Sequence, residues 1–194
     1  MRYSVEHKAQ SQERILDAAR ELFRARGFDG ASIDQVMAAA GLTRGAFYAH
    51  FDSKADLVRQ VLAIEAGLVH TLRRTTEAKD PQAAALATLT DYLDPSQRAN
   101  NATGCPLVAH PVDAIRGDAD RGNGYTEQLK ALIASVDAII DGDDTSQDAA
   151  ILVSVLTVGG ALLSAASTDR HLADGIEAVC LDRIAAIVGH PVGG

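Results

Sequence analysis

The chain has 194 residues, no tryptophan and only 4% aromatic residues, so its core has to be built mainly from Leu, Ile, Val and Ala. The formal net charge of −8 argues against a protein that coats nucleic acid regardless of sequence, because that mode needs many phosphate contacts. The two cysteines, Cys105 and Cys180, lie far apart without a CxxC pair, so neither a disulfide framework nor a zinc site is indicated.

The charge is unevenly distributed along the chain. Residues 1–59 carry nine basic and eight acidic side chains, whereas residues 60–194 carry nine and eighteen. The N-terminal part is therefore the part expected to approach an anionic partner. Its first residues, MRYSVEHKAQSQER, are polar and show no signal peptide, which predicts a cytoplasmic protein.

The first predicted helix runs from about Gln10 to Arg26, and Gly27 followed by Phe28 is typical of its C-terminal stop. Its inward stripe has helical spacing and consists of Ile15, Ala18, Ala19, Leu22 and Phe23. Most of its basic side chains are interpreted as a solvated face, with Lys8 and Arg14 kept as candidates for phosphate contact.

Residues 32–57 predict two short helices and the start of a third. Ser32 and Gln35 have the spacing of a capping box, Gly41 suits the left-handed end of a helix, and Thr43 can cap the next one. A helix, a glycine turn and a second helix form the outline of a helix-turn-helix. The second helix directs Phe47 and Phe51 inward and leaves small or hydrogen-bonding groups outside, which favours a surface offered to a groove.

The motif GLTRGAFYAHFDSKADL, residues 41–57, resembles the N-terminal signature of the TetR family of bacterial transcriptional regulators. The resemblance covers about residues 11–59 and departs from the family pattern at Ala55, where glutamate is usual. Asp56 can still close a capping box with Ser53. The resemblance implies an all-α fold: a three-helix helix-turn-helix head, residues 1–56, followed by a helical ligand-binding and dimerisation bundle, residues 57–194. The family consists mostly of repressors.

Arg44 is the best candidate for reading a base, because a guanidinium group can form a bidentate pair with guanine. Thr43 suits a phosphate or a base edge, while Gly45 and Ala46 keep the helix surface thin. The resemblance implies that Tyr48, His50 and Lys54 bind phosphates of double-stranded DNA. The predicted DNA contacts are Ser32, Thr43, Arg44, Gly45, Ala46, Tyr48, His50 and Lys54. A dimer would read an inverted-repeat operator, since adjacent major grooves repeat every 34–36 Å or so.

The remaining chain predicts further helices separated by loops. Helices are expected over residues 54–74, 81–93, 125–140, 147–167 and 172–188, with loops over 95–104 and 116–124. Residues 149–166 carry no charge and reach the length of a membrane span, but small and polar residues favour a helix buried in a bundle. We expect the last two helices to pair with their copies in a homodimer, with no membrane partner.

A regulator also needs an input, which the resemblance identifies as a small molecule of unknown identity in the C-terminal helices. Candidate lining residues are the few polar or aromatic groups among aliphatic ones, although each also suits a core or surface role: Tyr92, Cys105, His110, Tyr125, Leu129 and Thr157. One alternative is a repressor that senses oxidants or electrophiles through Cys105. Another class, a cysteine hydrolase, would use Cys105, His110 and Asp113, but no oxyanion-hole motif accompanies them. No metal, cofactor or catalytic residue is predicted.

Overall fold

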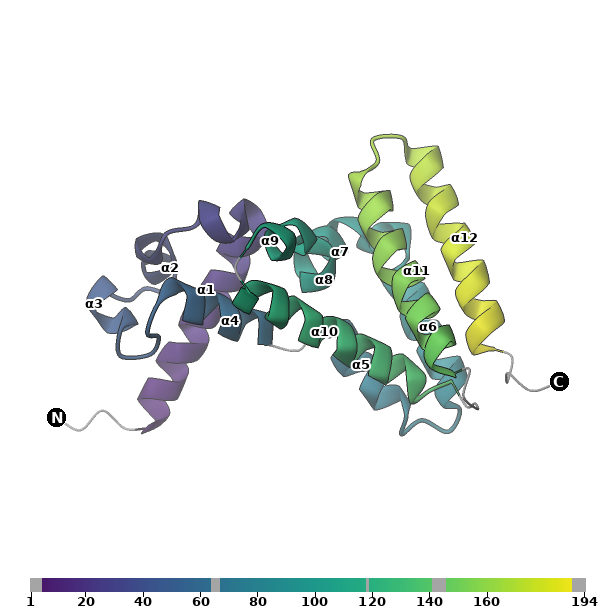
Figure 1. Cartoon of the computed structure of the whole chain (residues 1–194), viewed down its shortest axis with the longest axis horizontal. Coiled ribbons are helices and arrows are strands. Elements are labelled where there is room, and N and C mark those ends of the chain that lie inside the picture. Colours follow the sequence, from purple (N-terminus) through teal and green to yellow (C-terminus); the bar gives the residue numbers. More distant parts are fainter. Residues whose placement is uncertain (1–4, 64–66, 118, 141–145, 190–194) are drawn as a thin grey trace. The chain divides into compact units, whose positions relative to one another are not determined.

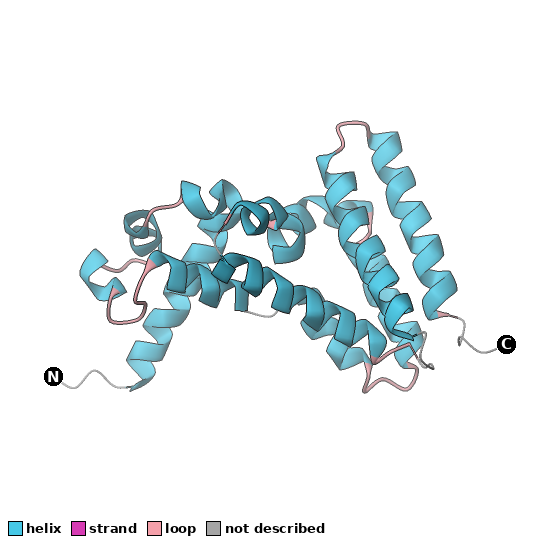
Figure 2. Cartoon of the chain, in the orientation of Figure 1, coloured by secondary structure: helices cyan, strands magenta, loops and turns pink. Residues whose placement is uncertain are grey.

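The computed structural model describes residues 5–63, 67–117, 119–140 and 146–189, and within these ranges all regular structure is helical (Figures 1 and 2). The predicted all-α fold is thereby confirmed. In chain order the elements are α1 (Val5–Gly30), α2 (Ile33–Ala39), α3 (Arg44–Phe47), α4 (Lys54–Ala63), α5 (Gly67–Thr75), α6 (Pro81–Tyr92), the 3₁₀ turn η1 (Pro95–Gln97), α7 (Arg98–Gly104), α8 (Pro106–Ala109), α9 (Pro111–Arg116), α10 (Ala119–Asp137), α11 (Ser146–Ala166) and α12 (Arg170–Val188).

The chain forms two compact units. The N-terminal unit comprises Met1–Ile64 together with His110–Tyr125, and the C-terminal unit comprises Glu65–Ala109 and Thr126–Gly194. The first unit thus contains α1 to α4, α9 and the beginning of α10. No signal in the sequence linked residues 110–125 to the N-terminal helices.

The core of the N-terminal unit is aromatic and aliphatic. Phe23 and Phe28 are fully buried and meet edge to face at 5.2 Å between ring centroids. Between them Gly27 has φ 70° and ψ 169°, which interrupts the helical backbone of α1 and confirms the predicted stop. The other large members of this core come from α1 to α4 and from the turn between α3 and α4, and they include Ile15, Met37, Phe47, Phe51, Leu57 and Leu62.

Residues 110–125 pack onto the end of α1. The buried His110 ring stacks on Phe28 at 4.4 Å, and its Nδ1 lies 3.1 Å from Oδ2 of Asp113. Arg121 donates to Asp29 over 3.0 Å and lies above the Phe28 ring. The hydrogen bond and the positive charge of Arg121 hold the pKa of Asp29 below its ordinary value.

The loop predicted over 116–124 is wrong, because Ala119–Gly124 begin α10. Glycine is unfavourable inside a helix, so the sequence argued against one. Packing reverses that preference, since a Cβ atom at Gly124 would lie 3.1 Å from Leu62. A residue with a side chain at position 124 would therefore crowd Leu62, and glycine leaves room for α10 to pack there.

The C-terminal unit is a bundle in which α11 contacts α12, α7 and α8, while α6 contacts α5 and α12. The polar loop predicted over 95–104 is wrong, because these residues form η1 and α7. Arg98, at the start of α7, is buried and makes a bidentate pair with the buried Glu177 of α12, at 2.9 and 2.6 Å. Its Nη2 also donates to Asp174 over 2.7 Å. These carboxylates raise the pKa of Arg98 above its ordinary value.

Two long helices were predicted, one over residues 54–74 and one that includes the uncharged residues 149–166. The helix expected over 54–74 is described as α4 and α5, and Ile64 lies outside the described residues. By length and composition alone α11 could cross a membrane, a test that the core helix of a soluble bundle also passes. Val153, Thr157 and Ala161 of α11 are buried among the bundle helices, whereas Leu152, Val155 and Leu163 on its other side are exposed. The prediction of a helix buried on every side is therefore correct for one side of α11 only within this chain.

The buried pair joins residues 79 positions apart, so its removal should destabilise the bundle. We expect Arg98→Ala to lower the free energy of unfolding by about 3–5 kcal/mol, because Glu177 is left buried without a cation. Urea denaturation followed by circular dichroism measures this. As a control, Lys130→Ala removes an exposed pair with Glu127 and should cost less than about 1 kcal/mol. An equal loss of unfolding free energy in Arg98→Ala and Lys130→Ala would contradict a stabilising role for the buried Arg98–Glu177 pair.

Candidate nucleic-acid interface

Residues 32–42 position α2 and the turn that follows it. Ser32 Oγ accepts from the backbone N–H of Gln35, whose side chain accepts from Ser32 N, so the predicted capping box is present. Gly41 has φ 67°, the left-handed conformation expected at the end of the helix. Arg14 donates to the carbonyl of Ala40 over 2.5 Å. Arg14, which the sequence predicts as a candidate for phosphate contact, therefore forms a hydrogen bond with the C-cap residue of α2.

The second helix of the motif, α3, covers only Arg44–Phe47, and hydrogen-bonded turns continue the chain to Phe51. Phe47 and Phe51 are fully buried and stacked, with ring centroids 5.4 Å apart. These two rings anchor the short helix against the core of the N-terminal unit. They fix which of its side chains face outward.

The outward side of α3 carries the residues expected to contact DNA. Arg44 and Tyr48 have about 60% of their surface exposed, and the side of Gly45 opens onto empty space. Thr43 is the N-cap of α3 by position, but its side chain makes no capping hydrogen bond. The prediction that its hydroxyl caps the helix is therefore wrong, and the hydroxyl stays available at the surface.

One contact on this surface was not anticipated from the sequence. Nη1 of Arg44 donates to Oδ2 of Asp34 over 2.6 Å, and both side chains are exposed. Asp34 lies in the first turn of α2, ten residues before Arg44. No motif spacing identifies this partner, because the distance depends on how α2 and α3 pack.

His50 and Lys54 follow α3, both partly exposed. Partial burial, with a contribution from the charge of Lys8, lowers the pKa of His50 below its ordinary value, so the imidazole is mainly neutral at pH 7. Its Nδ1 is buried and has no hydrogen-bond partner among the described residues. Lys54 begins α4, where Ser53 Oγ accepts from Asp56 N and the Asp56 carboxylate accepts from Asp52 N. In the predicted capping box the Asp56 carboxylate would accept from the backbone N–H of Ser53, but it accepts from that of Asp52, one residue earlier.

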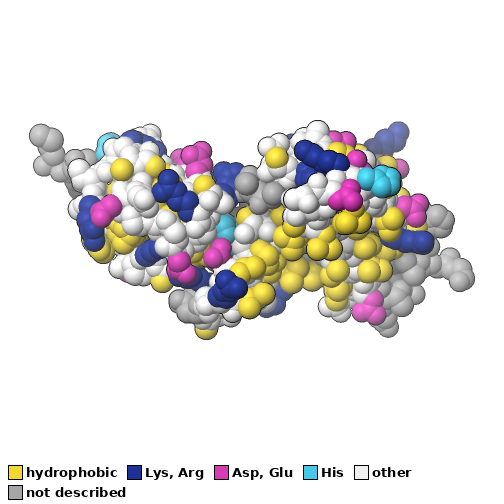
Figure 3. All heavy atoms as spheres, turned by 90° about the horizontal axis from the view of Figure 1, so that it is seen from above, with side chains coloured by type: hydrophobic (Ala, Val, Ile, Leu, Met, Phe, Trp, Pro, Cys, Tyr) yellow, Lys and Arg dark blue, Asp and Glu magenta, His cyan; other side chains and the backbone are white. Residues whose placement is uncertain are grey.

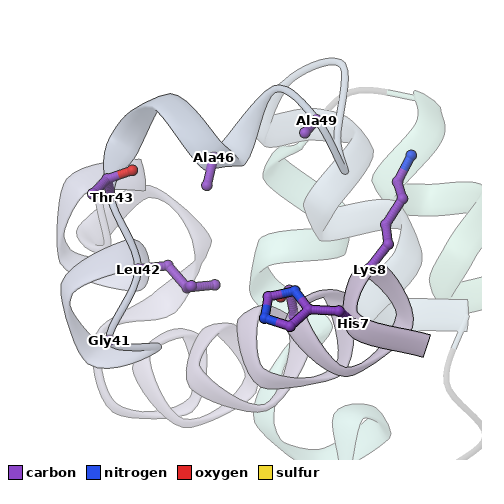
Figure 4. Close-up of a pocket in the computed structure, with 8 residues that line it drawn as sticks. His7, Lys8, Gly41, Leu42, Thr43, Ala46 and Ala49 are labelled. Atoms are coloured by element: carbon purple, nitrogen blue, oxygen red, sulfur yellow. The ribbon is translucent and has the colours of Figure 1, made fainter. Parts of the chain in front are cut away.

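A hollow of about 920 Å³ lies beside α3 in the N-terminal unit. Leu42 and Ala46 border it on one side and His7 of α1 on the other, while Lys8 lies at the edge near Ala49 (Figure 4). Gly41, Thr43 and Ser11 complete its lining. Lys8 is one of the two α1 side chains that the sequence predicts as candidates for phosphate contact.

The residues predicted to line an effector site are spread over both units. Tyr92 lines a hollow of about 150 Å³ in the C-terminal unit, together with Leu68, Thr71, Thr88, Asp91, Gln97 and Asn101. Thr157 is fully buried and donates to the carbonyl of Val153 over 2.7 Å. Leu129 is partly buried in α10, and Cys105 is buried between α7 and α8. His110 and Tyr125 belong to the N-terminal unit.

The described residues contain no group of three or more His, Cys, Asp or Glu side chains placed to hold a metal ion. His110 and Asp113 are hydrogen-bonded, as a hydrolase would require, but the His110 ring is covered by Phe28. Cys105 belongs to the other unit, and its thiol is buried. The geometry therefore does not favour the hydrolase interpretation.

Residues 15–61 match the model of the family described as bacterial regulatory proteins, tetR family. The chain is also 34% identical over 89 residues to the uncharacterized HTH-type transcriptional regulator YfiR of Bacillus subtilis, a match covering 46% of this chain and 42% of the relative. The fold is similar to that of Escherichia coli NemR in its reduced form, with a TM-score of 0.76 at 18% identity over 94% of this chain and 99% of that one. It is also similar to SmeT in complex with triclosan, with a TM-score of 0.68 at 18% identity over 94% and 96% of the two chains.

His110 should make folding stability depend on pH. Burial, as the largest cause, lowers its pKa below the ordinary 6.5, so the unfolded chain binds more protons as the pH falls through that value. The free energy of unfolding should therefore decrease from about pH 7 downward until the folded pKa is reached. His110→Asn removes this component, so the stability difference between parent and variant should narrow on acidification. Urea titrations at several pH values measure it, and a constant difference would contradict the prediction.

Proposed function

Because this chain belongs, through residues 15–61, to the TetR family of bacterial regulatory proteins, we propose that it is a ligand-responsive transcriptional regulator that binds double-stranded DNA as a homodimer. The observation that carries this proposal is the outward side of α3. There the exposed Arg44 begins α3 and the exposed Tyr48 is its C-cap, and the buried Phe47 and Phe51 anchor this segment. We place its action in the cytoplasm and favour a repressor, because the family consists mostly of repressors.

The exposed groups divide into two kinds of contact. Arg44 reads guanine in the major groove, while the small surfaces of Gly45 and Ala46 let α3 enter it. The hydroxyls of Thr43, Tyr48 and Ser32 and the cations of the head bind phosphate and fix the register. Ser32 keeps its O–H as a donor, since its oxygen already accepts from Gln35 N. Lys54 adds a positive charge at the beginning of α4, where the helix dipole also favours an anion.

The exposed apolar residues of the last two helices support a homodimer. Apolar side chains gather in a patch on this part of the molecule (Figure 3). Leu152, Val155 and Leu163 form one stripe on α11, and Leu172 and Val179 form another on α12. In the middle of each stripe a glycine, Gly159 or Gly175, has open space where a Cβ would be. Such stripes suit close contact with the same helices of a second copy.

Gly160 has a different role from its neighbour Gly159. A Cβ atom at Gly160 would lie 3.0 Å from Sγ of Cys180, so this glycine serves the contact between α11 and α12 of one chain. The paired glycines thus serve both sides of α11. One faces the bundle, and the other faces the proposed partner.

The input of the regulator is a small molecule in the C-terminal unit. The hollow beside Tyr92 offers both polar and apolar groups, and the triclosan complex of the similarly folded SmeT supports a ligand of this kind. The effector acts by binding more tightly to the conformation that does not fit the operator. The alternative, sensing through Cys105, has less support because oxidation requires an accessible thiolate and this thiol is buried.

The DNA contacts are tested by two substitutions with different signatures. We expect Arg44→Ala to weaken binding to the operator by about 1–3 kcal/mol while leaving binding to random duplexes nearly unchanged. Lys54→Ala should weaken binding to all duplexes and reduce the log–log salt slope by about 0.9, the loss of one phosphate contact. Fluorescence anisotropy at several salt concentrations measures both. Unchanged operator affinity in Arg44→Ala would overturn its assignment as a base reader.

The proposed dimer is tested by charging the apolar stripe. Val155→Glu places a carboxylate in the middle of the α11 stripe and should convert the dimer to monomer, because an unpaired charge is costly to bury. Ile115→Glu is a matched control, since Ile115 is 82% exposed but belongs to the N-terminal unit. Sedimentation velocity measures the mass of each variant. A Val155→Glu protein that remains dimeric would contradict this interface.

A further inference from the structure

The Asp34–Arg44 pair joins the two helices of the helix-turn-helix at its exposed surface. The distance of 2.6 Å between Nη1 and Oδ2 is that of a charge-assisted hydrogen bond. About 60% of each side chain is exposed, so the pair lies on the surface that is proposed to meet DNA. No other protein group bonds to either side chain among the residues that the structure describes.

Asp34 and Arg44 both lie in the first turn of a helix whose position is set by buried residues. Asp34 lies in the first turn of α2, which the capping box of Ser32 and Gln35 holds and the buried Val36 and Met37 anchor. Arg44 is the first residue of α3 and is separated by one turn from the buried Phe47. The carboxylate therefore occupies a defined place relative to the arginine, and it does not depend on a flexible loop.

The pair has little value for the stability of the fold or for attraction to DNA. An exposed ion pair contributes about 0–1 kcal/mol to folding. A carboxylate beside the reading helix also repels phosphate, so it should lower the affinity for every DNA sequence. A residue that adds little stability and costs affinity is best explained by an effect on sequence discrimination.

We propose that Asp34 is a specificity-determining residue that orients Arg44 for guanine, an inference that rests on the proposed DNA-reading function. A guanidinium group offers two edges for bidentate bonding. With Nη1 held by Asp34, the edge formed by Nε and Nη2 remains for O6 and N7 of guanine. Without Asp34 the arginine side chain is free to rotate toward phosphates, which every sequence provides.

Asp34 also adds a preference of its own at the neighbouring position. Its second carboxylate oxygen, Oδ1, can accept a hydrogen bond from the N4 amino group of cytosine. The same oxygen repels base edges that present only acceptors, such as O6 and N7 of guanine. The pair therefore reads one guanine and favours an amino-bearing base beside it.

The test begins with in vitro selection of duplexes from a random library by the full-length protein. We expect an inverted repeat with a guanine in each half-site. The affinities of the parent, Asp34→Ala and Asp34→Asn are then measured for the selected duplex, for the same duplex with that guanine replaced by adenine, and for a random duplex. Asp17→Ala is the matched control, because it removes an exposed carboxylate that pairs with Arg20 elsewhere in the same unit.

In Asp34→Ala the preference for guanine over adenine should fall about tenfold, while binding to the random duplex is equal or tighter. Asp34→Asn should keep part of the preference, because its amide oxygen can still accept from Nη1. In an Arg44→Ala background, Asp34→Ala should not change the preference for guanine over adenine at this position any further, since Asp34 acts on this position through Arg44. Asp17→Ala should leave the preference unchanged.

Three results would overturn the proposal, and they are distinguishable. A preference for guanine that survives in Asp34→Ala rejects Asp34 as a specificity determinant and leaves the DNA-reading function intact. A uniform loss of binding with a lower melting temperature assigns the pair to folding instead. If the parent protein enriches no sequence at all, the proposed function itself fails.

Discussion

The burial of Phe47 and Phe51 is the constraint on which the orientation of α3, the proposed DNA-reading helix, depends. A helix of four residues has too few hydrogen bonds to be stable alone, so its orientation must come from tertiary packing. The two stacked rings supply that packing, and their side of the helix is thereby fixed as the inner one. The outward direction of Arg44, Gly45 and Tyr48 follows. The orientation of this surface is thus a geometric consequence of the burial of two aromatic rings.

The sequence predicted this region well because its signals are local. The capping box, the left-handed Gly41 and the spacing of the apolar residues all act within a few positions, and the structure confirms each of them. The predictions failed over 95–104 and 116–124, where local signals indicated loops and packing produced helices. At Gly124 the residue that disfavours a helix is the residue that lets the helix approach Leu62.

The partners in the Arg98–Glu177 and Asp34–Arg44 ion pairs could not be predicted from the sequence for a different reason. Arg98 and Glu177 are 79 positions apart, and Asp34 and Arg44 lie on two helices whose packing sets their distance. Nothing in the spacing of a single sequence selects one carboxylate among 26 acidic residues as the partner of a given arginine. The same holds for residues 110–125, whose packing on Phe28 depends on the stacking of His110. Such partners become visible only when both elements have been placed.

The two ion pairs differ in burial, and burial determines how much free energy is needed to break each pair. Arg98 and Glu177 are withdrawn from water, so their pair is expensive to break and holds α7 to α12. Glu177 faces the bundle, whereas Val179, two residues later on α12, faces outward. The buried pair therefore also sets which side of α12 is offered to the proposed partner subunit. Asp34 and Arg44 remain exposed, so their pair can open at little cost, which is compatible with the contact to DNA proposed for Arg44.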